Sequence, residues 1–143
     1  MALLVAGEFP QADMDKVIRM CLIHDFGEAV TGDIPAFQKT RQDEENEDLA
    51  IENMLKLLPE DLASQFNDLF LEMSQLSTLE AKLFKGLDNL EALVSHNESS
   101  LDTWLPLEYT ENLIYGTENV AFSEYLKELR EEIKKDSIQK IEG

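Results

Sequence analysis

The sequence predicts an all-α protein, a compact bundle of about six to seven helices. Almost every segment places apolar residues at helical spacing, and no segment combines alternating apolar residues with the β-branched enrichment typical of a strand. Helix-start signals recur between the apolar runs. With 143 residues and 43% hydrophobic content, the chain can bury one core, so we expect a single domain over residues 1–143.

The first predicted elements are a short apolar helix over residues 1–6 and a longer helix after a turn at residues 9–12. Asp13 is a suitable N-cap for the longer helix, which we expect to reach about Ala29. Residues 17–23 carry more apolar surface than a single stripe, which indicates a central position in the bundle.

A break is predicted at residues 31–35, where glycine and proline interrupt the helical pattern. Thr40 and Asp43 resemble a capping box that opens a helix reaching Leu58, and Pro59 ends this helix and begins the next one. The buried face of that next helix is expected to consist of Leu62, Phe66, Leu69, Phe70 and Met73.

The second half of the chain predicts a tightly packed, leucine-rich helix that Ser77 and Glu80 open as a second capping box. A loop over residues 97–106 follows, and it contains the only tryptophan. A short helix should then end near Gly116, and a final amphipathic helix should run over residues 117–138. The apolar stripe of the leucine-rich helix consists of Leu79, Leu83, Leu87, Leu90 and Val94.

The charge balance excludes several classes of partner. A formal net charge of −18 opposes binding to DNA or RNA and also repels a free nucleotide, so phosphate chemistry here needs a cation. The single cysteine, Cys21, excludes an internal disulfide and suits a reducing compartment, and we expect it to be buried and inert. Because residues 1–6 are too few to span a bilayer and follow no basic segment, we expect a cytoplasmic protein without a membrane partner.

Candidate chemistry lies in a polar sequence that directly follows a buried helical segment. His24 and Asp25 are adjacent, and on a helix Glu28 would lie within one turn of both. Asp88 directly follows a leucine of the leucine-rich helix, where an unpaired buried carboxylate would be costly. One nitrogen and two carboxylates, from His24, Asp25 and Asp88, suit a divalent ion such as Mn, Co, Zn or Mg.

Four segments together resemble the HD-domain phosphohydrolases, in particular the compact 5′-deoxynucleotidase-like branch. They are His24-Asp25, Glu28, residues 31–34 and residues 88–91, and the resemblance extends over nearly the whole chain. It implies that His24, Asp25 and Asp88 bind one divalent metal, whether Mn, Co, Zn, Mg or Fe. It also implies that Glu28 and Asp33 act near the attacked phosphate, that the substrate is a (deoxy)nucleoside 5′-monophosphate, and that the chain forms a homodimer.

The sequence departs from the family pattern at the first metal ligand. In the family, a further His lies upstream of a segment resembling residues 1–8, but no His precedes His24 here, and Asn89 occupies a position where the family often has Lys. The chain is therefore interpreted as an N-terminally shortened HD domain, either because its start is internal to a longer product or because it is a natural short form. For the chain as given, we expect weak metal retention and low turnover.

Two other functions remain open at this level. A shortened chain could be a non-catalytic helical module that binds a partner or dimerises through exposed apolar surface. Alternatively, the hydrolase chemistry could act on an alarmone or a cyclic nucleotide, as in other branches of the family.

Each candidate residue also has a purely structural interpretation. His24 and Asp25 could be a satisfied pair at a helix end, and Asp88 a surface acid beside the leucine stripe. Glu28 and Asp33 could be a surface glutamate and a turn-forming aspartate. His96 is expected to be favoured by the helix C-terminus, although it could also approach the site. Lys39 and Arg41 could meet a phosphate. The acidic residues 43–48 are expected to form a solvated helix face.

Overall fold

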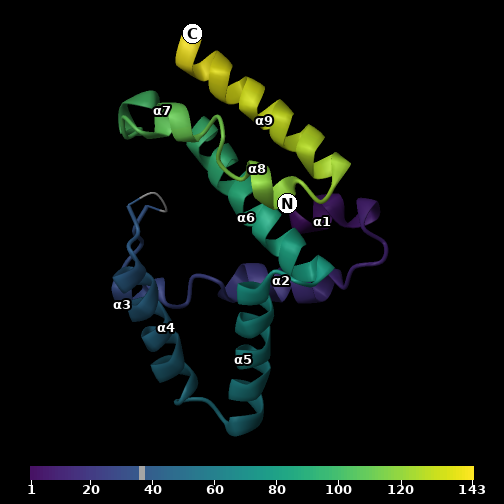
Figure 1. Ribbon diagram of the computed structural model, residues 1–143, viewed down its shortest axis with the longest axis vertical. Coiled ribbons are helices and arrows are strands. Elements are labelled where there is room, and N and C mark those ends of the chain that lie inside the picture. Colours follow the sequence, from purple (N-terminus) through teal and green to yellow (C-terminus); the bar gives the residue numbers. More distant parts are fainter. Residues whose placement is uncertain (36–37) are drawn as a thin grey trace.

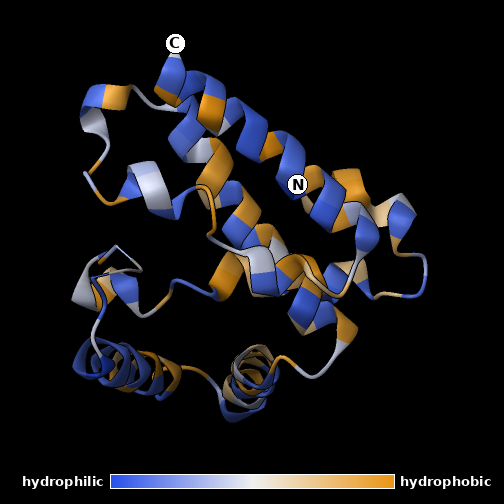
Figure 2. Ribbon diagram, turned by 45° about the horizontal axis from the view of Figure 1, so that its top comes forward, coloured by the Kyte–Doolittle hydropathy of each residue, from blue (hydrophilic) through white to orange (hydrophobic). Residues whose placement is uncertain are grey.

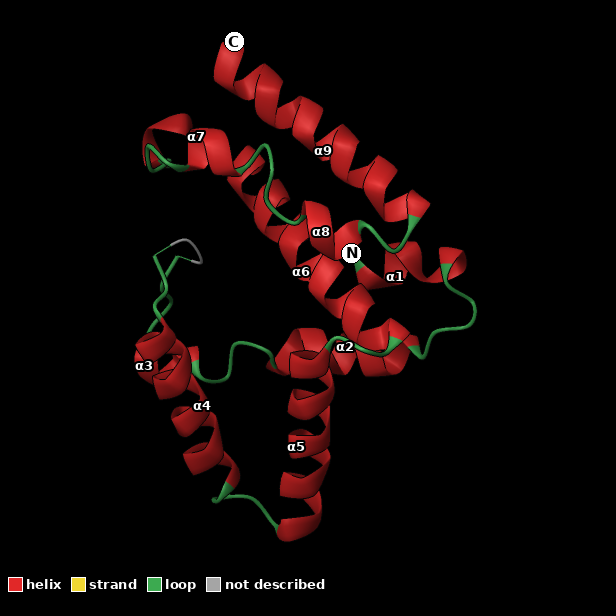
Figure 3. Ribbon diagram, in the orientation of Figure 1, coloured by secondary structure: helices red, strands yellow, loops and turns green. Residues whose placement is uncertain are grey.

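The computed structural model describes residues 1–35 and 38–143, and all regular structure in this part of the chain is helical (Figure 3). The predicted all-α class is therefore confirmed. Four of the α-helical segments are single turns of four residues, and two short 3₁₀ turns occur at Ala6–Glu8 and Leu101–Thr103. The order is α1 (Ala2–Val5), α2 (Met14–Ile23), α3 (Glu28–Thr31), α4 (Arg41–Leu55), α5 (Glu60–Gln75), α6 (Leu79–Glu98), α7 (Glu108–Glu111), α8 (Thr117–Val120) and α9 (Glu124–Glu142).

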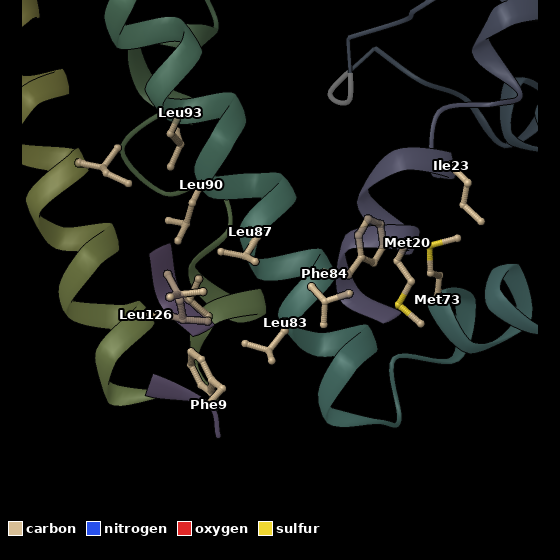
Figure 4. Close-up of a cluster of buried hydrophobic side chains, with 14 residues drawn as sticks. Phe9, Met20, Ile23, Met73, Leu83, Phe84, Leu87, Leu90, Leu93 and Leu126 are labelled. Carbon is tan, nitrogen blue, oxygen red and sulfur yellow. The ribbon is translucent and has the colours of Figure 1, made fainter. Parts of the chain in front are cut away.

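Helix α6 is the centre of the bundle. It contacts α2, α5, α8 and α9, and Figure 1 shows α9 running beside it while α2 crosses its first half. Its apolar residues are almost fully buried, and Figure 4 shows how they bridge two groups of side chains. Phe84 lies with Met20 of α2 and Met73 of α5, whereas Leu83 lies on the side of Phe9 and Leu126. This packing fixes the position of every side chain that α6 directs at its neighbours.

Helices α4 and α5 extend away from the centre, below α2 in the view of Figure 1. Much of their surface is hydrophilic in Figure 2, and α4 buries only Ala50 and Leu55. Thr40 and Asp43 form the predicted capping box at the start of α4. On α5, Met73 is buried, and the expected Phe66, Leu69 and Phe70 pack against the core, but Leu62 is 39% exposed because it lies in the outer first turn.

The helix predicted to reach Ala29 ends at Ile23, which changes the geometry of the polar sequence that follows. Phe26, Glu28 and Ala29 donate backbone hydrogen bonds three residues back instead of four, so the chain forms a tight turn before α3. In this turn Gly27 approaches α4 closely, because a Cβ at Gly27 would lie 3.1 Å from the Cβ of Glu47. The predicted one-turn spacing of His24 and Glu28 on a continuous helix is therefore wrong.

Two other predicted helix boundaries also differ from the structure. Leu76 takes a left-handed conformation with φ of 49° after α5, so the cap of α6 is Thr78, whose hydroxyl accepts from the Ala81 amide, and not Ser77. The final helix is split into α8 and α9, because Ser123 caps a new start at Glu124. In the described part of the chain, no helix combines the length and the apolar character that crossing a membrane would require.

Candidate functional site

His24 brings together two carboxylates from different parts of the chain. Its Nε2 lies 3.1 Å from Asp25 Oδ2 and 3.2 Å from Asp88 Oδ1. His24 and Asp25 occupy the turn after α2, whereas Asp88 lies on α6, and the contact between these two helices holds the three side chains together. The structure thus pairs the three predicted metal ligands, and Asp88 is not an isolated surface acid.

The backbone of α2 fixes the orientation of the His24 ring. Nδ1 lies 2.9 Å from the Cys21 carbonyl oxygen, and because a carbonyl only accepts, Nδ1 must carry a proton and donate it. The ring also packs edge-on against Phe84, with 5.4 Å between the ring centroids. Nε2 is consequently directed at the two carboxylates, which is the arrangement of a histidine ligand whose other nitrogen is held by a carbonyl.

The two carboxylates favour a positive charge at His24. Partial burial lowers the pKa of His24, but the hydrogen bond to Asp88 and the charges of Asp25 and Asp88 outweigh it, so the pKa lies above its usual value. Burial likewise acts to raise the pKa of Asp88, yet His24 and Lys85 keep it below the usual range. Lys85 Nζ donates to the second oxygen of Asp88 at 2.8 Å.

Asp25 and Glu28 are held in an environment rich in negative charge. Burial raises the pKa of Asp25, and nearby Asp88 and Asp33 raise it further against the opposing effect of His24. The pKa of Glu28 is also raised, first by burial and then by Asp25 and Asp33. A region that disfavours further negative charge in this way is one where a cation would be stabilised.

Glu28 lies near Lys39, a residue that the sequence analysis described only as one that could meet a phosphate. Lys39 Nζ lies 2.7 Å from Glu47 Oε1 and 3.8 Å from Glu28 Oε1, and all three side chains are largely buried. Lys39 thus connects α3 and α4 behind the candidate site. Glu47 corrects the expectation of a fully solvated acidic face over residues 43–48, whereas Arg41 is 91% exposed and pairs with Glu45.

Asp33 lies apart from the three paired ligands, at the rim of a cavity of ≈ 240 Å³. The cavity lies between the segment after α3, the second half of α6 and the α7 region. His96 lines it two helical turns beyond Asp88. The remaining lining residues are Pro35, Ala92, Leu93, Glu108, Glu111, Asn112 and Tyr115.

Asn89, where the family often has Lys, is part of the core. It is 1% exposed, its Nδ2 donates to the Tyr115 hydroxyl at 3.0 Å, and its Oδ1 accepts from Asn119 Nδ2 at 2.7 Å. A Cβ on Gly116 would lie 2.8 Å from the Asn89 Cβ, so the chain passes directly over this side chain. Asn89 therefore joins α6 to α8 and is not positioned as a phosphate ligand.

The paired residues fit a divalent cation in donor type and spacing. Bonds of about 2.1 Å from one ion to two ligands place those ligands about 3.0–3.4 Å apart, which matches the separations of 3.1 and 3.2 Å at His24 Nε2. Within residues 1–35 and 38–143, however, no group of three or more His, Cys, Asp or Glu side chains forms a ready-made metal cluster. The three predicted ligands therefore meet in pairs at His24 Nε2, as they would around a proton.

Sequence reasoning missed the residues that orient this site. Lys85 precedes Asp88 by three residues and Cys21 precedes His24 by three, so helical spacing could have indicated both. The contact between Lys39 and Glu47 depends on how α4 packs against the turn, and no sequence signal marks it. Cys21 is half-buried, and burial and the nearby Asp88 raise its pKa, in keeping with the expected inert thiol.

Comparison with known proteins identifies several relatives of this chain. The chain is 35% identical over 104 residues to 5'-deoxynucleotidase HDDC2 of Bos taurus and 33% identical over 104 residues to that of Homo sapiens, with 68% of this chain and 48% of each relative covered. A relative named 5'-deoxynucleotidase hdd1 from Schizosaccharomyces pombe is 27% identical over 90 residues, covering 59% of this chain and 46% of its own.

The chain spans about half the length of the curated relatives it matches, and no solved structure matches it. A family model described as HD domain matches residues 1–130, which include every residue of the candidate site. The chain therefore belongs to the HD domain family, in the branch that resembles the 5′-deoxynucleotidases.

Proposed function

We propose that this chain is a divalent-metal-dependent phosphohydrolase that removes the 5′-phosphate from (deoxy)nucleoside monophosphates. The observation that carries the proposal is the convergence of Asp25 and Asp88 on His24 Nε2, with Nδ1 fixed by the Cys21 carbonyl. The names of the relatives support a nucleotide phosphohydrolase.

In this proposal His24, Asp25 and Asp88 hold the metal, which would polarise the phosphoryl group and lower the pKa of a water molecule. Nδ1 of His24 donates to the Cys21 carbonyl, so Nε2 is the nitrogen that would face the ion. A bound cation would also offset the negative charge of the chain, −18 in total, which otherwise repels a phosphate.

Glu28 is the proposed proton acceptor. The water oxygen bonds to phosphorus, and the bond from phosphorus to the 5′ oxygen breaks. Glu28 takes the water proton and passes it to the released 5′ oxygen, which gives a nucleoside and inorganic phosphate. The raised pKa of Glu28 makes its carboxylate a better base, and Lys39 holds it in place. Asp33, at the rim of the cavity, is placed to accept a hydrogen bond from a sugar hydroxyl.

Phosphate release from the deoxynucleoside and ribonucleoside monophosphates tests this function, in the presence of Mn, Co, Zn, Mg or Fe ions in turn. We expect metal-dependent release that His24→Ala abolishes, together with loss of bound metal. His96→Ala, which changes the other histidine, is the matched control and should retain the metal. Release that no ion stimulates, or that His24→Ala leaves intact, would contradict the proposal.

A second candidate function is association through α1. Leu3 and Leu4 are 79% and 85% exposed, which leaves a small apolar surface on this helix. This surface supports a homodimer or an interaction module. Either form of association is compatible with a catalytically active or an inactive chain. Sedimentation of the chain and of a Leu3→Ser, Leu4→Ser variant tests it: a dimer that the double variant converts to monomer is expected, and two identical monomers would contradict it.

A further inference from the structure

Glu47 is a buried acid at the contact between α4 and the turn that precedes Glu28. Helix α3, which begins at Glu28, packs beside α4 (Figure 1). A Cβ built on Gly27 would lie 3.1 Å from both the Cβ and the backbone oxygen of Glu47, so the turn touches α4 at this residue. The Glu47 side chain is only 16% exposed, whereas its acidic neighbours Glu45 and Asp48 are exposed. Its burial therefore distinguishes Glu47 from the rest of the acidic segment.

One ammonium group serves two carboxylates at this contact. Lys39 Nζ lies 2.7 Å from Glu47 Oε1, which is direct contact, but 3.8 Å from Glu28 Oε1. The Glu47 Oε1 atom is enclosed by the protein, and a buried charge that loses its partner is strongly destabilising. Lys39 is therefore held by Glu47, and it approaches Glu28 without direct contact.

This difference in distance matters for a residue that has to accept a proton. In the proposed reaction, a Glu28 oxygen must accept a hydrogen bond from the attacking water. An ammonium group in direct contact would donate its own hydrogen bonds to that carboxylate and occupy the lone pairs that the water needs. At 3.8 Å, the positive charge of Lys39 still attracts the carboxylate and limits its orientations.

We propose that Glu47 is a positioning residue for Glu28. It holds Lys39 at a distance from which Lys39 orients the Glu28 carboxylate but leaves its oxygens available to water. The proposal rests on the proposed function for the role of Glu28 as proton acceptor. It makes a specific prediction: without the Glu47 charge, Lys39 should move into direct contact with Glu28.

The first test measures this change in the metal-free protein and requires no activity. The coupling between Lys39 and Glu28 is obtained from the denaturant midpoints of Lys39→Met, Glu28→Gln and the double variant. We expect this coupling to be small when Glu47 is present and to become at least about twice as large in a Glu47→Gln chain. A coupling that Glu47→Gln leaves unchanged would overturn the proposal.

The second test uses phosphate release by the metal-loaded protein. Glu47→Gln should lower kcat about tenfold and change KM less than about twofold, because Glu47 is not proposed to bind the substrate. Adding Lys39→Met to this variant should raise kcat again, at least about threefold, because the competing ammonium group is then absent. A merely structural role for the ion pair predicts the opposite, and a second loss of kcat in the double variant would overturn the proposal.

Glu45→Gln is the matched control, because Glu45 pairs with Arg41 on the exposed side of the same helix. It should change neither the coupling nor kcat, and a control that reproduces the effects of Glu47→Gln would overturn the proposal. The two tests also separate this proposal from the proposed function. Coupling that increases as expected in a chain that releases no phosphate would contradict the proposed function alone, and unchanged coupling in an active enzyme would contradict the role of Glu47 alone.

Discussion

The two histidines of this chain have similar neighbours but different supports. His24 and His96 both lie beside carboxylates along one side of α6, and both have Nδ1 2.9 Å from an oxygen. For His24 that oxygen is a backbone carbonyl of α2, and Nε2 lies 3.1 and 3.2 Å from two carboxylates. For His96 it is the side chain of Asn112, and Nε2 lies 3.6 Å from Glu108 alone.

This difference indicates two kinds of site. A ring fixed by the main chain, with two carboxylates at its free nitrogen, is suited to one small cation. The His96 ring has Asn112 at Nδ1 and Glu108 at Nε2, so both of its nitrogens face side chains of the α7 region and neither faces a second carboxylate. Glu108 reinforces the contrast, because one of its oxygens already accepts from the Leu105 amide at 2.7 Å and so serves the local backbone.

The largest difference between the two histidine sites is expected in metal affinity, measured with one carboxylate variant at each site. Asp88→Asn removes one proposed ligand with little change in shape, and we expect it to lower metal affinity and kcat/KM by at least about a hundredfold. Glu108→Gln makes the same chemical change beside His96 and should leave the metal content unaltered. Metal lost equally from both variants, as measured by elemental analysis, would remove the distinction.

A second prediction distinguishes proton transfer by Glu28 from metal binding. Glu28→Gln keeps the shape of the side chain but removes its basicity, so we expect kcat to fall by about 10²–10⁴-fold while the metal is retained. KM should change far less than kcat, because Glu28 is not proposed to bind the substrate. Full activity in this variant would require another base.

The pH dependence of stability in the metal-free protein should report on His24. The folded pKa of His24 is raised, so its stabilising contribution is complete below the unfolded pKa of about 6.5 and is lost as pH rises through the folded pKa. Denaturant midpoints measured from about pH 6 upward should therefore decrease, and His24→Gln should remove that part of the decrease. A decrease of the same size in the variant would assign it to other groups.

The smallest expected effect is that of Lys85 on the metal affinity of the proposed site. Lys85 places a positive charge against Asp88, and its side chain is 37% exposed, so solvent screens much of its field. Replacing it with Met should tighten metal binding by about two- to fivefold at neutral pH, because one competing cation is removed. Isothermal titration with Mn or Co can measure a change of this size, and weaker binding would show that Lys85 supports the site.

The helical class and the apolar stripe of α6 could be predicted from local sequence. Spacing placed Leu83, Leu87 and Leu90 on one buried stripe. The capping box at Thr40 was predicted and is confirmed. It was predictable because its two hydrogen bonds involve only neighbouring residues. These features depend on short-range geometry that the sequence determines by itself.

Features created by tertiary contacts were not predictable in this way. The longer helix ends at Ile23 because the following turn packs Gly27 against α4, and nothing near Gly27 in the sequence identifies Glu47 as its neighbour. The contact between Asn112 and His96 Nδ1 likewise exists only because the segment after α7 is folded against α6. Such contacts decide where Glu28 and the cavity lie, and therefore what the site can bind.

Anomalous diffraction from crystals of this chain grown with Mn or Co is the measurement that tests the central claim most directly. The account predicts one anomalous peak at about 2.0–2.3 Å from His24 Nε2 and from oxygens of Asp25 and Asp88. A peak at His96 in place of His24, or no peak at either histidine at saturating metal, would contradict the assignment of these three residues as metal ligands.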